Sequence, residues 1–262
     1  MTHLVAGARE VDAGKTTFTV GLLASLDGVG FKPRAGNDVW HHHDDYRRAI
    51  EEGRMVGKDA RRLADASAAD VVPEEINPVH RLWRPDPGDG GFLGRTGRRF
   101  VLDRVGDGYV VNATADVPDA AREALSLSGA PRVADVDELN EQIRSRHLPH
   151  LDALARRIED TEPAVVESYG DVARPIRDLD VSRAAVVEPE RVRIYDGDRY
   201  ENACDVVSSD PREGRLEVIV RNVVDVIDPI ETVELPPLTE DERADPTRVA
   251  GAYVEGYEAL LT

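Results

Sequence analysis

The chain contains little cysteine, little lysine and no long apolar run. Its 262 residues include one cysteine, Cys204, so neither an intramolecular disulfide nor a cysteine metal cluster can form. A lack of disulfides is typical of a reducing compartment. The longest apolar runs are only a few residues, which is too short for a membrane span or for the apolar part of a signal peptide. These absences predict a soluble, cytoplasmic protein.

The charged residues are unusual in number and in kind. Of the 33 basic residues only three are lysine, Lys15, Lys32 and Lys58, and all the others are arginine. The 51 acidic residues are spread along the chain and give a formal net charge of −18. This composition is typical of a cytoplasmic protein from a high-salt organism and disfavours a general role in nucleic-acid binding. A lysine that remains in such a chain suggests a task that arginine cannot perform.

A strand pattern and a helix pattern flank a glycine-containing turn near the start of the chain. Leu4-Val5-Ala6 predicts a strand, and apolar residues at helical spacing from Phe18 to Leu26 predict a helix. The turn between them, Ala8 to Thr17, ends in Gly-Lys-Thr-Thr. Strand, glycine-containing loop, Gly-Lys-Thr and helix form the arrangement of a phosphate-binding loop.

The residues of this turn suit a nucleotide phosphate. Backbone N–H groups at a helix N-terminus face the phosphates, and Gly14 lets the backbone come close. Lys15 can reach the β- and γ-phosphates as a compact point charge, and the Thr16 hydroxyl can bind Mg²⁺. Arg9 stands where the usual first glycine is expected, and Gly7 is the nearest glycine upstream. We expect nucleotide contacts from Asp12, Ala13, Gly14, Lys15, Thr16 and Thr17.

The rest of the chain alternates short apolar strands with helical segments. After the first helix, residues 28–36 indicate a turn, a short second strand and a glycine exit, and further strand patterns fall at 164–167, 183–187 and 216–220. Helical patterns fall at 44–53, 59–69, 136–159, 200–208 and 246–261, and Pro149 allows a break within the third of these. This alternation predicts one doubly wound α/β domain over residues 1–262, with a mostly parallel sheet and helices on both faces, as in P-loop NTPases.

One region departs from the alternation. Gly106-Asp107-Gly108 joins two apolar runs, which is a hairpin signature. We interpret residues 85 to 116 as a hairpin and loop region inserted into the α/β core.

Carboxylates and histidines supply further candidate ligands. Glu167 ends the apolar strand at 164–167, and the carboxyl end of such a strand faces the crevice where ligands bind. The run His41-His42-His43 is either a metal cluster or, as we favour, a solvated or substrate-facing loop, because consecutive residues do not all face one ion. Cys204 is expected to be a small buried hydrophobe.

Six separated segments keep the order of motifs in one family. In chain order they are Ala8 to Thr17, Gly30 to Gly36, Lys58 to Ala60, Ile76 to Pro78, Val165 to Gly170 and Val218 to Asn222. Together they resemble the dethiobiotin synthetases, which belong to a wider class with the cobyrinic acid amide synthases and the MinD-like ATPases. The first segment is similar to that family's Gly-Thr-Asp-Thr-x-Val-Gly-Lys-Thr, and the fifth to its Val-Glu-Gly-Ala-Gly-Gly.

The resemblance implies a Mg²⁺- and ATP-dependent site. It implies that Thr16, Asp59 and Glu167 share the Mg²⁺, with Asp44 and Asp45 as rivals of Asp59. It also implies that Lys15 and Lys32 flank the reacting centre as catalytic residues. The last segment resembles the family's Gly-Trp-Val-Ala-Asn strand near the nucleotide base, which places Asn222 beside adenine or, if GTP is used, guanine.

Departures from the family motif concern the substrate. Ser168-Tyr169, followed by Gly170-Asp171, stands where the family has small residues and a glycine pair. We therefore expect phosphoryl transfer or ATP-driven ligation on another small carboxylate- or amine-bearing metabolite, with no membrane partner and a possible homodimer. The alternative is a MinD-like dimeric nucleotide switch or regulatory ATPase or GTPase that acts through a protein partner. That class usually has an additional early lysine, where this chain has Arg9 and Glu10.

Overall fold

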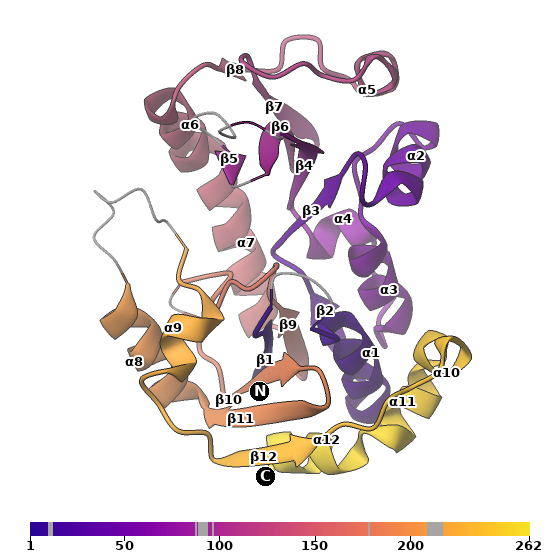
Figure 1. Cartoon of the computed structure of the whole chain (residues 1–262), viewed down its shortest axis with the longest axis vertical. Coiled ribbons are helices and arrows are strands. Elements are labelled where there is room, and N and C mark those ends of the chain that lie inside the picture. Colours follow the sequence, from indigo (N-terminus) through magenta and orange to yellow (C-terminus); the bar gives the residue numbers. More distant parts are fainter. Residues whose placement is uncertain (10–12, 87, 89–93, 96, 178, 209–216) are drawn as a thin grey trace. The chain divides into compact units, whose positions relative to one another are not determined.

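The computed structural model describes residues 1–9, 13–86, 88, 94–95, 97–177, 179–208 and 217–262. The chain forms two compact units. The first consists of Met1–Pro33, Arg62–Val72 and Ala155–Thr262, and the second of Arg34–Arg61 and Pro73–Leu154. The α/β class predicted from the sequence is confirmed, but there are two sheets rather than one (Figure 1). The prediction of one domain over residues 1–262 stays a prediction.

The first unit contains a sheet and the helices that cover it. Its strands are β1 (Thr2–Gly7), β2 (Val29–Phe31), β9 (Ala164–Glu167), β10 (Arg183–Glu188), β11 (Arg191–Asp196) and β12 (Glu231–Glu234). Its helices are α1 (Lys15–Leu26), α8 (Gly197–Val207), α9 (Val220–Val224), α10 (Glu240–Ala244), α11 (Pro246–Ala252) and α12 (Val254–Leu261).

The strand order of this sheet is β12-β11-β10-β1-β9-β2. The strands β10, β1, β9 and β2 are parallel, and β11 and β12 extend the sheet as antiparallel strands. Every residue of β1 is buried, as its central position requires. The strand–helix–strand start predicted from the sequence is therefore confirmed, with β9 inserted between β1 and β2. Since parallel strands end at one edge, the residues that follow them gather there.

Helices cover both faces of the first sheet, as predicted. The Tyr200 ring of α8 lies 5.7 Å from the Tyr195 ring of β11, centroid to centroid. On α12, a methyl group at Gly256 would lie 3.2 Å from Cγ1 of Val192, also on β11. Val192 and Tyr195 are three residues apart on one strand, so they face opposite sides of the sheet. The helix α1 shares the α12 face, because the Phe18 and Tyr257 rings lie 4.8 Å apart.

The second unit contains the other sheet. Its strands are β3 (Arg34–Asp38), β4 (Val79–Pro85), β5 (Gly94–Arg95), β6 (Arg98–Val105), β7 (Gly108–Asn112) and β8 (Arg132–Val133). Its helices are α2 (His43–Glu51), α4 (Pro73–Ile76), α5 (Asp119–Ala124), α6 (Val136–Gln142) and a π-helix (Ile143–His147). Two further helices, α3 (Lys58–Ala66) and α7 (Leu148–Glu159), contribute residues to both units.

The predicted hairpin is confirmed as the antiparallel pair β6–β7, joined at Gly106 in the left-handed region. It is an integral part of the second sheet, whose order is β3-β4-β6-β7-β8 with β5 beside β6. The buried Asp103 of β6 accepts two hydrogen bonds of 2.7 Å from Arg81 and lies 2.9 Å from Nε2 of His147. Burial opposes ionisation, but Arg81 and His147 hold the pKa of Asp103 well below its usual range.

Three local predictions differ from the structure. The strand predicted at 216–220 is wrong for its described residues, since Ile219 forms only an isolated bridge with Val172 and α9 begins at Val220. The final helix is interrupted at Tyr253 and forms α11 and α12. The helix predicted at 136–159 does not break at Pro149, but contains the π-helix instead. Apolar spacing alone does not distinguish these alternatives.

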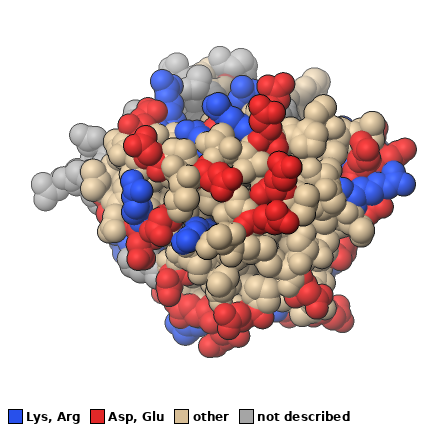
Figure 2. Space-filling view, turned by 90° about the horizontal axis from the view of Figure 1, so that it is seen from below, with Lys and Arg blue, Asp and Glu red and all other residues tan. Residues whose placement is uncertain are grey.

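The acidic surface follows from the composition. On the face shown in Figure 2, aspartate and glutamate side chains occur in several separate groups, with fewer basic side chains among them. In the part of the chain that the structure describes, no helix has the length and the apolar character that crossing a membrane requires.

Acid should destabilise the first unit through His3. This residue of β1 is 1% exposed, and burial, the N-terminal ammonium group and Arg183 lower its pKa from 6.5 to about 4. Between these values the unfolded chain takes up a proton that the folded chain does not, so stability falls as the pH drops from about 6.5 to about 4. Relative to His3→Leu, the wild-type protein should lose about 2 kcal/mol of unfolding free energy between pH 7 and pH 5.

Urea denaturation at the two pH values measures this loss. The matched control is His41→Leu, which replaces an exposed histidine. An equal pH dependence in wild type and His3→Leu would show that His3 does not contribute.

Candidate functional site

Four parallel strands of the first sheet end at one edge. Gly7 ends β1, Glu167 ends β9, Lys32 directly follows β2, and Val187 lies near the end of β10. The amide of Ala8 donates to the carbonyl of Val187, so the chain leaving β1 passes across the end of β10. Ligands of open α/β sheets bind in the crevice outside these carboxyl ends.

Gly14 begins the helix α1 at this edge. Its φ of 87° is left-handed, and it caps the helix without a side-chain hydrogen bond. A methyl group at Gly14 would lie 3.7 Å from Val187, so glycine is required by the backbone conformation rather than by lack of space. The first N–H groups of a helix have no partner within it, and they attract anions. The described part of the predicted phosphate-binding turn thus supplies a helix N-terminus.

The Lys15 side chain turns back from α1 over the end of β1. A methyl group at Gly7 would lie 2.8 Å from both Cδ and Nζ of Lys15, so a larger residue at this position would displace the end of the lysine side chain. The ammonium group donates a hydrogen bond of 2.7 Å to the carbonyl of Gly170. Lys15 is 9% exposed, and its charge is therefore held at the strand ends and not in solvent.

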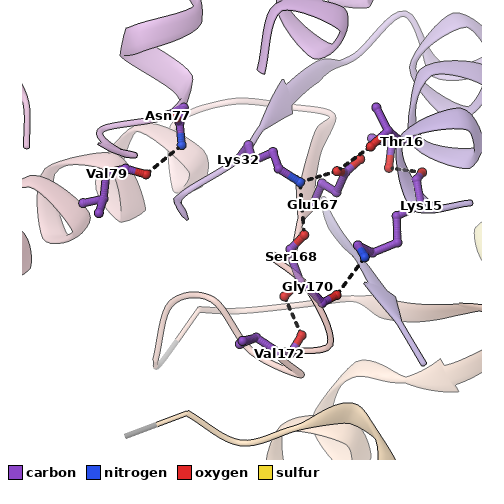
Figure 3. Close-up of polar contacts among 10 residues, drawn as sticks. Lys15, Thr16, Lys32, Asn77, Val79, Glu167, Ser168, Gly170 and Val172 are labelled. Carbon is purple, nitrogen blue, oxygen red and sulfur yellow. Dashed lines mark hydrogen bonds and ion pairs between the residues drawn. The ribbon is translucent and has the colours of Figure 1, made fainter. Parts of the chain in front are cut away.

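Glu167 is the centre of the polar contacts in Figure 3. Its side chain is 0% exposed. One carboxylate oxygen, Oε1, accepts a hydrogen bond of 3.0 Å from Oγ1 of Thr16 and is also bonded by the Lys32 ammonium. The other oxygen, Oε2, is buried without a hydrogen-bond partner among the described residues. A buried carboxylate oxygen without a partner is costly, so its presence needs an explanation.

Lys32 forms a buried ion pair with Glu167. Its side chain is 4% exposed and reaches the carboxylate from the end of the neighbouring strand β2. It donates a second hydrogen bond, 3.2 Å long, to the carbonyl of Ser168. Two of the three lysines of the chain therefore lie at the same strand ends.

The turn after Glu167 fixes the carbonyl groups that receive these lysines. The amide of Ser168 donates to Val5 of β1, and its hydroxyl donates to the carbonyl of Val172. Gly170 has a left-handed φ of 56°, which glycine adopts without strain. Ser168, which departs from the family motif, thus uses its hydroxyl hydrogen in a bond within the turn.

The structure brings together Gly14, Lys15, Thr16, Lys32 and Glu167 of the predicted site residues. Ala13 and Thr17 adjoin them on either side of the Gly-Lys-Thr turn, and Asp12 lies outside the described residues.

The resemblance implied that Asn222 follows a strand, but the residue is exposed on the helix α9. The start of α9 is nevertheless tied to the turn after Glu167, because the Val220 amide donates to Asp171. Its contact with a nucleotide base stays a prediction.

The predicted second metal carboxylate lies in the other unit. Asp59 is in the first turn of α3, and its share in the metal stays a prediction. Of its rivals, Asp45 accepts a 3.2 Å hydrogen bond from the amide of Lys58, and burial raises its pKa. Asp44 is exposed on α2.

The three consecutive histidines lie beside Asp38 at the start of α2. The Asp38 carboxylate accepts from the amides of Trp40 and His41, and Nδ1 of His42 accepts from the Asp38 amide. Among the described residues, no three His, Cys, Asp or Glu side chains are placed to hold a metal ion. His41 and His42 lie in the turn before α2, and His43 is the first residue of that helix. Cys204 is buried, as predicted, and burial raises the pKa of its thiol to about 12.

The sequence did not predict the groups that contact the two lysine side chains. Gly7 and the carbonyls of Ser168 and Gly170 have structural roles that follow from backbone geometry. The only sequence signals were a glycine at the end of a predicted strand and a glycine three residues after the carboxylate.

In comparisons with known proteins, no protein-family model matches the chain and no curated protein sequence matches it.

The effects of Glu167 and Lys32 on the stability of the first unit should be coupled, because the two charges compensate each other. Removing one partner of a buried ion pair leaves the other charge uncompensated, so Glu167→Gln should lower the unfolding free energy by about 3 kcal/mol. Adding Lys32→Met to this variant should recover most of the lost unfolding free energy, because neither buried charge then remains. Guanidinium denaturation of the single and double variants measures the coupling.

Glu51→Gln is the control for this cycle. It removes an exposed carboxylate that pairs with Arg47, and the change should stay within about 0.5 kcal/mol. Strictly additive effects of Glu167→Gln and Lys32→Met would contradict the assigned pair.

Proposed function

We propose that the chain is a Mg²⁺- and ATP-dependent P-loop NTPase that acts on a small carboxylate- or amine-bearing metabolite in the cytoplasm. The observation that carries the proposal is the contact of Thr16 with Glu167 beside Lys15 at the N-terminus of α1. A helix N-terminus and a lysine suit phosphate, and a hydroxyl with a carboxylate suits a hard cation. Their occurrence at the carboxyl ends of parallel strands supports a nucleotide site.

The residues fit a magnesium ion. Oε2 of Glu167 is a buried oxygen without a hydrogen-bond partner among the described residues, which makes it an available ligand for a cation. Thr16 and Glu167 would hold the metal together with phosphate oxygens. When bound, Mg²⁺ neutralises the charge that develops on phosphate oxygens.

The two lysines would act on the phosphates and the substrate. Lys15 can leave the Gly170 carbonyl for a phosphate oxygen by rotation of its flexible stem. N–H groups at the start of α1 would orient the same phosphates. The protein would then act by positioning the reacting oxygens and stabilising their charge, without forming a covalent intermediate. Lys32 enters from β2 and would meet the anionic groups at the reacting centre.

Calorimetric titration with ATP and GTP in the presence of Mg²⁺ tests nucleotide binding. High salt is used because the net charge is −18. Replacing Lys15 with alanine removes a charge-assisted contact to phosphate and should weaken binding roughly tenfold or more. Arg248→Ala, which removes an exposed cation on α11, should leave the affinity unchanged. Equal ATP affinity in Lys15→Ala and wild type would refute the phosphate role of the turn.

Phosphate release then separates the candidate activities. Release should rise in the presence of the acceptor metabolite, and diaminopelargonic acid with bicarbonate is the first acceptor to test because of the family resemblance. Nucleotide binding with slow release that no small acceptor stimulates would instead favour the dimeric switch, for which a homodimer dependent on ATP is the next measurement.

A further inference from the structure

The Lys32 ammonium bonds to the carboxylate that the proposed function assigns to the metal. Lys32 and Thr16 both donate to Oε1 of Glu167, while Oε2 has no hydrogen-bond partner in the part of the chain that the structure describes. All of this lies in a region where Lys32 is 3% and Glu167 0% exposed. Two cations on one buried carboxylate repel each other strongly, since little solvent screens them. A metal ion bound to the Glu167 carboxylate and the Lys32 ammonium bonded to the same carboxylate therefore compete.

We propose that Lys32 is the resident counter-cation of Glu167 and that Mg²⁺ replaces it. Metal binding then moves the Lys32 ammonium off the carboxylate and makes it available to an anionic group. This inference rests on the proposed function, because it takes Thr16 and Glu167 as metal ligands.

The asymmetry of the Glu167 contacts supports an exchange. A carboxylate that served only as a structural ion-pair partner would be expected to satisfy both oxygens, since an unpaired buried oxygen is costly. Here Oε2 offers a first point of contact to an incoming cation while Lys32 still holds Oε1. Lys32 also keeps its bond to the Ser168 carbonyl, so its departure from Oε1 does not leave it without a buried acceptor.

The choice of lysine at position 32 supports the same exchange. Thirty of the 33 basic residues are arginine, yet a lysine stands at this buried pair. An arginine can bond both carboxylate oxygens through its planar fork and would occupy Oε2 as well. A lysine is a point charge on a flexible stem that leaves one oxygen open and can move away.

Coupled binding of metal and nucleotide follows. The displaced ammonium group is most stable where an anion can receive it, and the nucleotide phosphates are such an anion. Mg²⁺ should therefore bind weakly alone and more tightly with nucleotide. The coupling is reciprocal, so Mg²⁺ should raise the affinity for nucleotide by the same factor.

Lysine-selective NMR on the wild-type protein reports the exchange directly. With [¹³Cε]lysine the chain has three lysine sites, which Lys58→Arg and Lys15→Arg assign. A non-hydrolysable ATP analogue in EDTA should shift the Lys15 signals and leave those of Lys32 in place. Adding Mg²⁺ should then shift the Lys32 signals.

The outcomes of this titration separate the two claims. A Lys32 signal that stays in place at saturating Mg²⁺, after the Lys15 signal has moved, overturns the exchange and leaves nucleotide binding intact. A Lys15 signal that never moves at saturating nucleotide and metal overturns the proposed function itself, and the exchange with it.

Metal affinity without nucleotide is the second measurement. Mn²⁺ binding, followed by electron paramagnetic resonance, should be about tenfold tighter or more in Lys32→Met, because the competing cation is gone. Lys32→Arg should bind Mn²⁺ no more tightly than wild type. Arg248→Met, which also removes one positive charge, should match wild type. Equal Mn²⁺ affinity in folded Lys32→Met and wild type overturns the proposal, and the NMR titration decides it if that variant does not fold.

Discussion

The buried carboxylate of Glu167 is the contact on which the candidate site depends. It ends β9 between β1 and β2, and it receives Thr16 from the helix after β1 and Lys32 from the residue after β2. One side chain therefore joins three consecutive parts of the parallel sheet. Because a buried charge is tolerated only with compensating partners, this carboxylate requires the two donors to approach it. Oε2 has no hydrogen-bond partner among the residues that the structure describes.

The distribution of basic residues has a physical meaning in this fold. The exposed basic positions are almost all arginine, while Lys15 and Lys32 are buried at the strand ends. Arginine suits a salt-exposed surface with many carboxylate neighbours, since its charge is permanent and its fork is bidentate. At the buried strand ends the compact ammonium groups reach single acceptors, the carbonyl of Gly170 and the carboxylate of Glu167. Lys58, the third lysine, is exposed and has no such environment.

Local patterns predicted the parts of the fold that depend on local chemistry. Apolar runs predicted β1, β9 and β10. Helical spacing from Phe18 to Leu26 predicted α1, which begins three residues earlier, at Lys15, directly after the left-handed Gly14. The hairpin β6–β7 was predictable from its glycines for the same reason. The division into two sheets was not, because the pairing of β3 with β4 and not with β2 depends on contacts distant in sequence. The carbonyl groups of Ser168 and Gly170 that accept from the lysines could not be predicted either, because a backbone acceptor does not depend on the type of side chain. The apolar run before Asn222 was compatible with a strand as well as with the short helix α9.

A crystal structure with Mg²⁺ and a non-hydrolysable ATP analogue tests the central claim most directly. The account predicts phosphates at the N–H groups that follow Gly14, with the Lys15 ammonium on a phosphate oxygen and the metal bonded by Thr16 and Glu167. A nucleotide bound elsewhere, with Lys15 still on the Gly170 carbonyl and no metal at Glu167, would contradict the assignment of these strand ends as a nucleotide site.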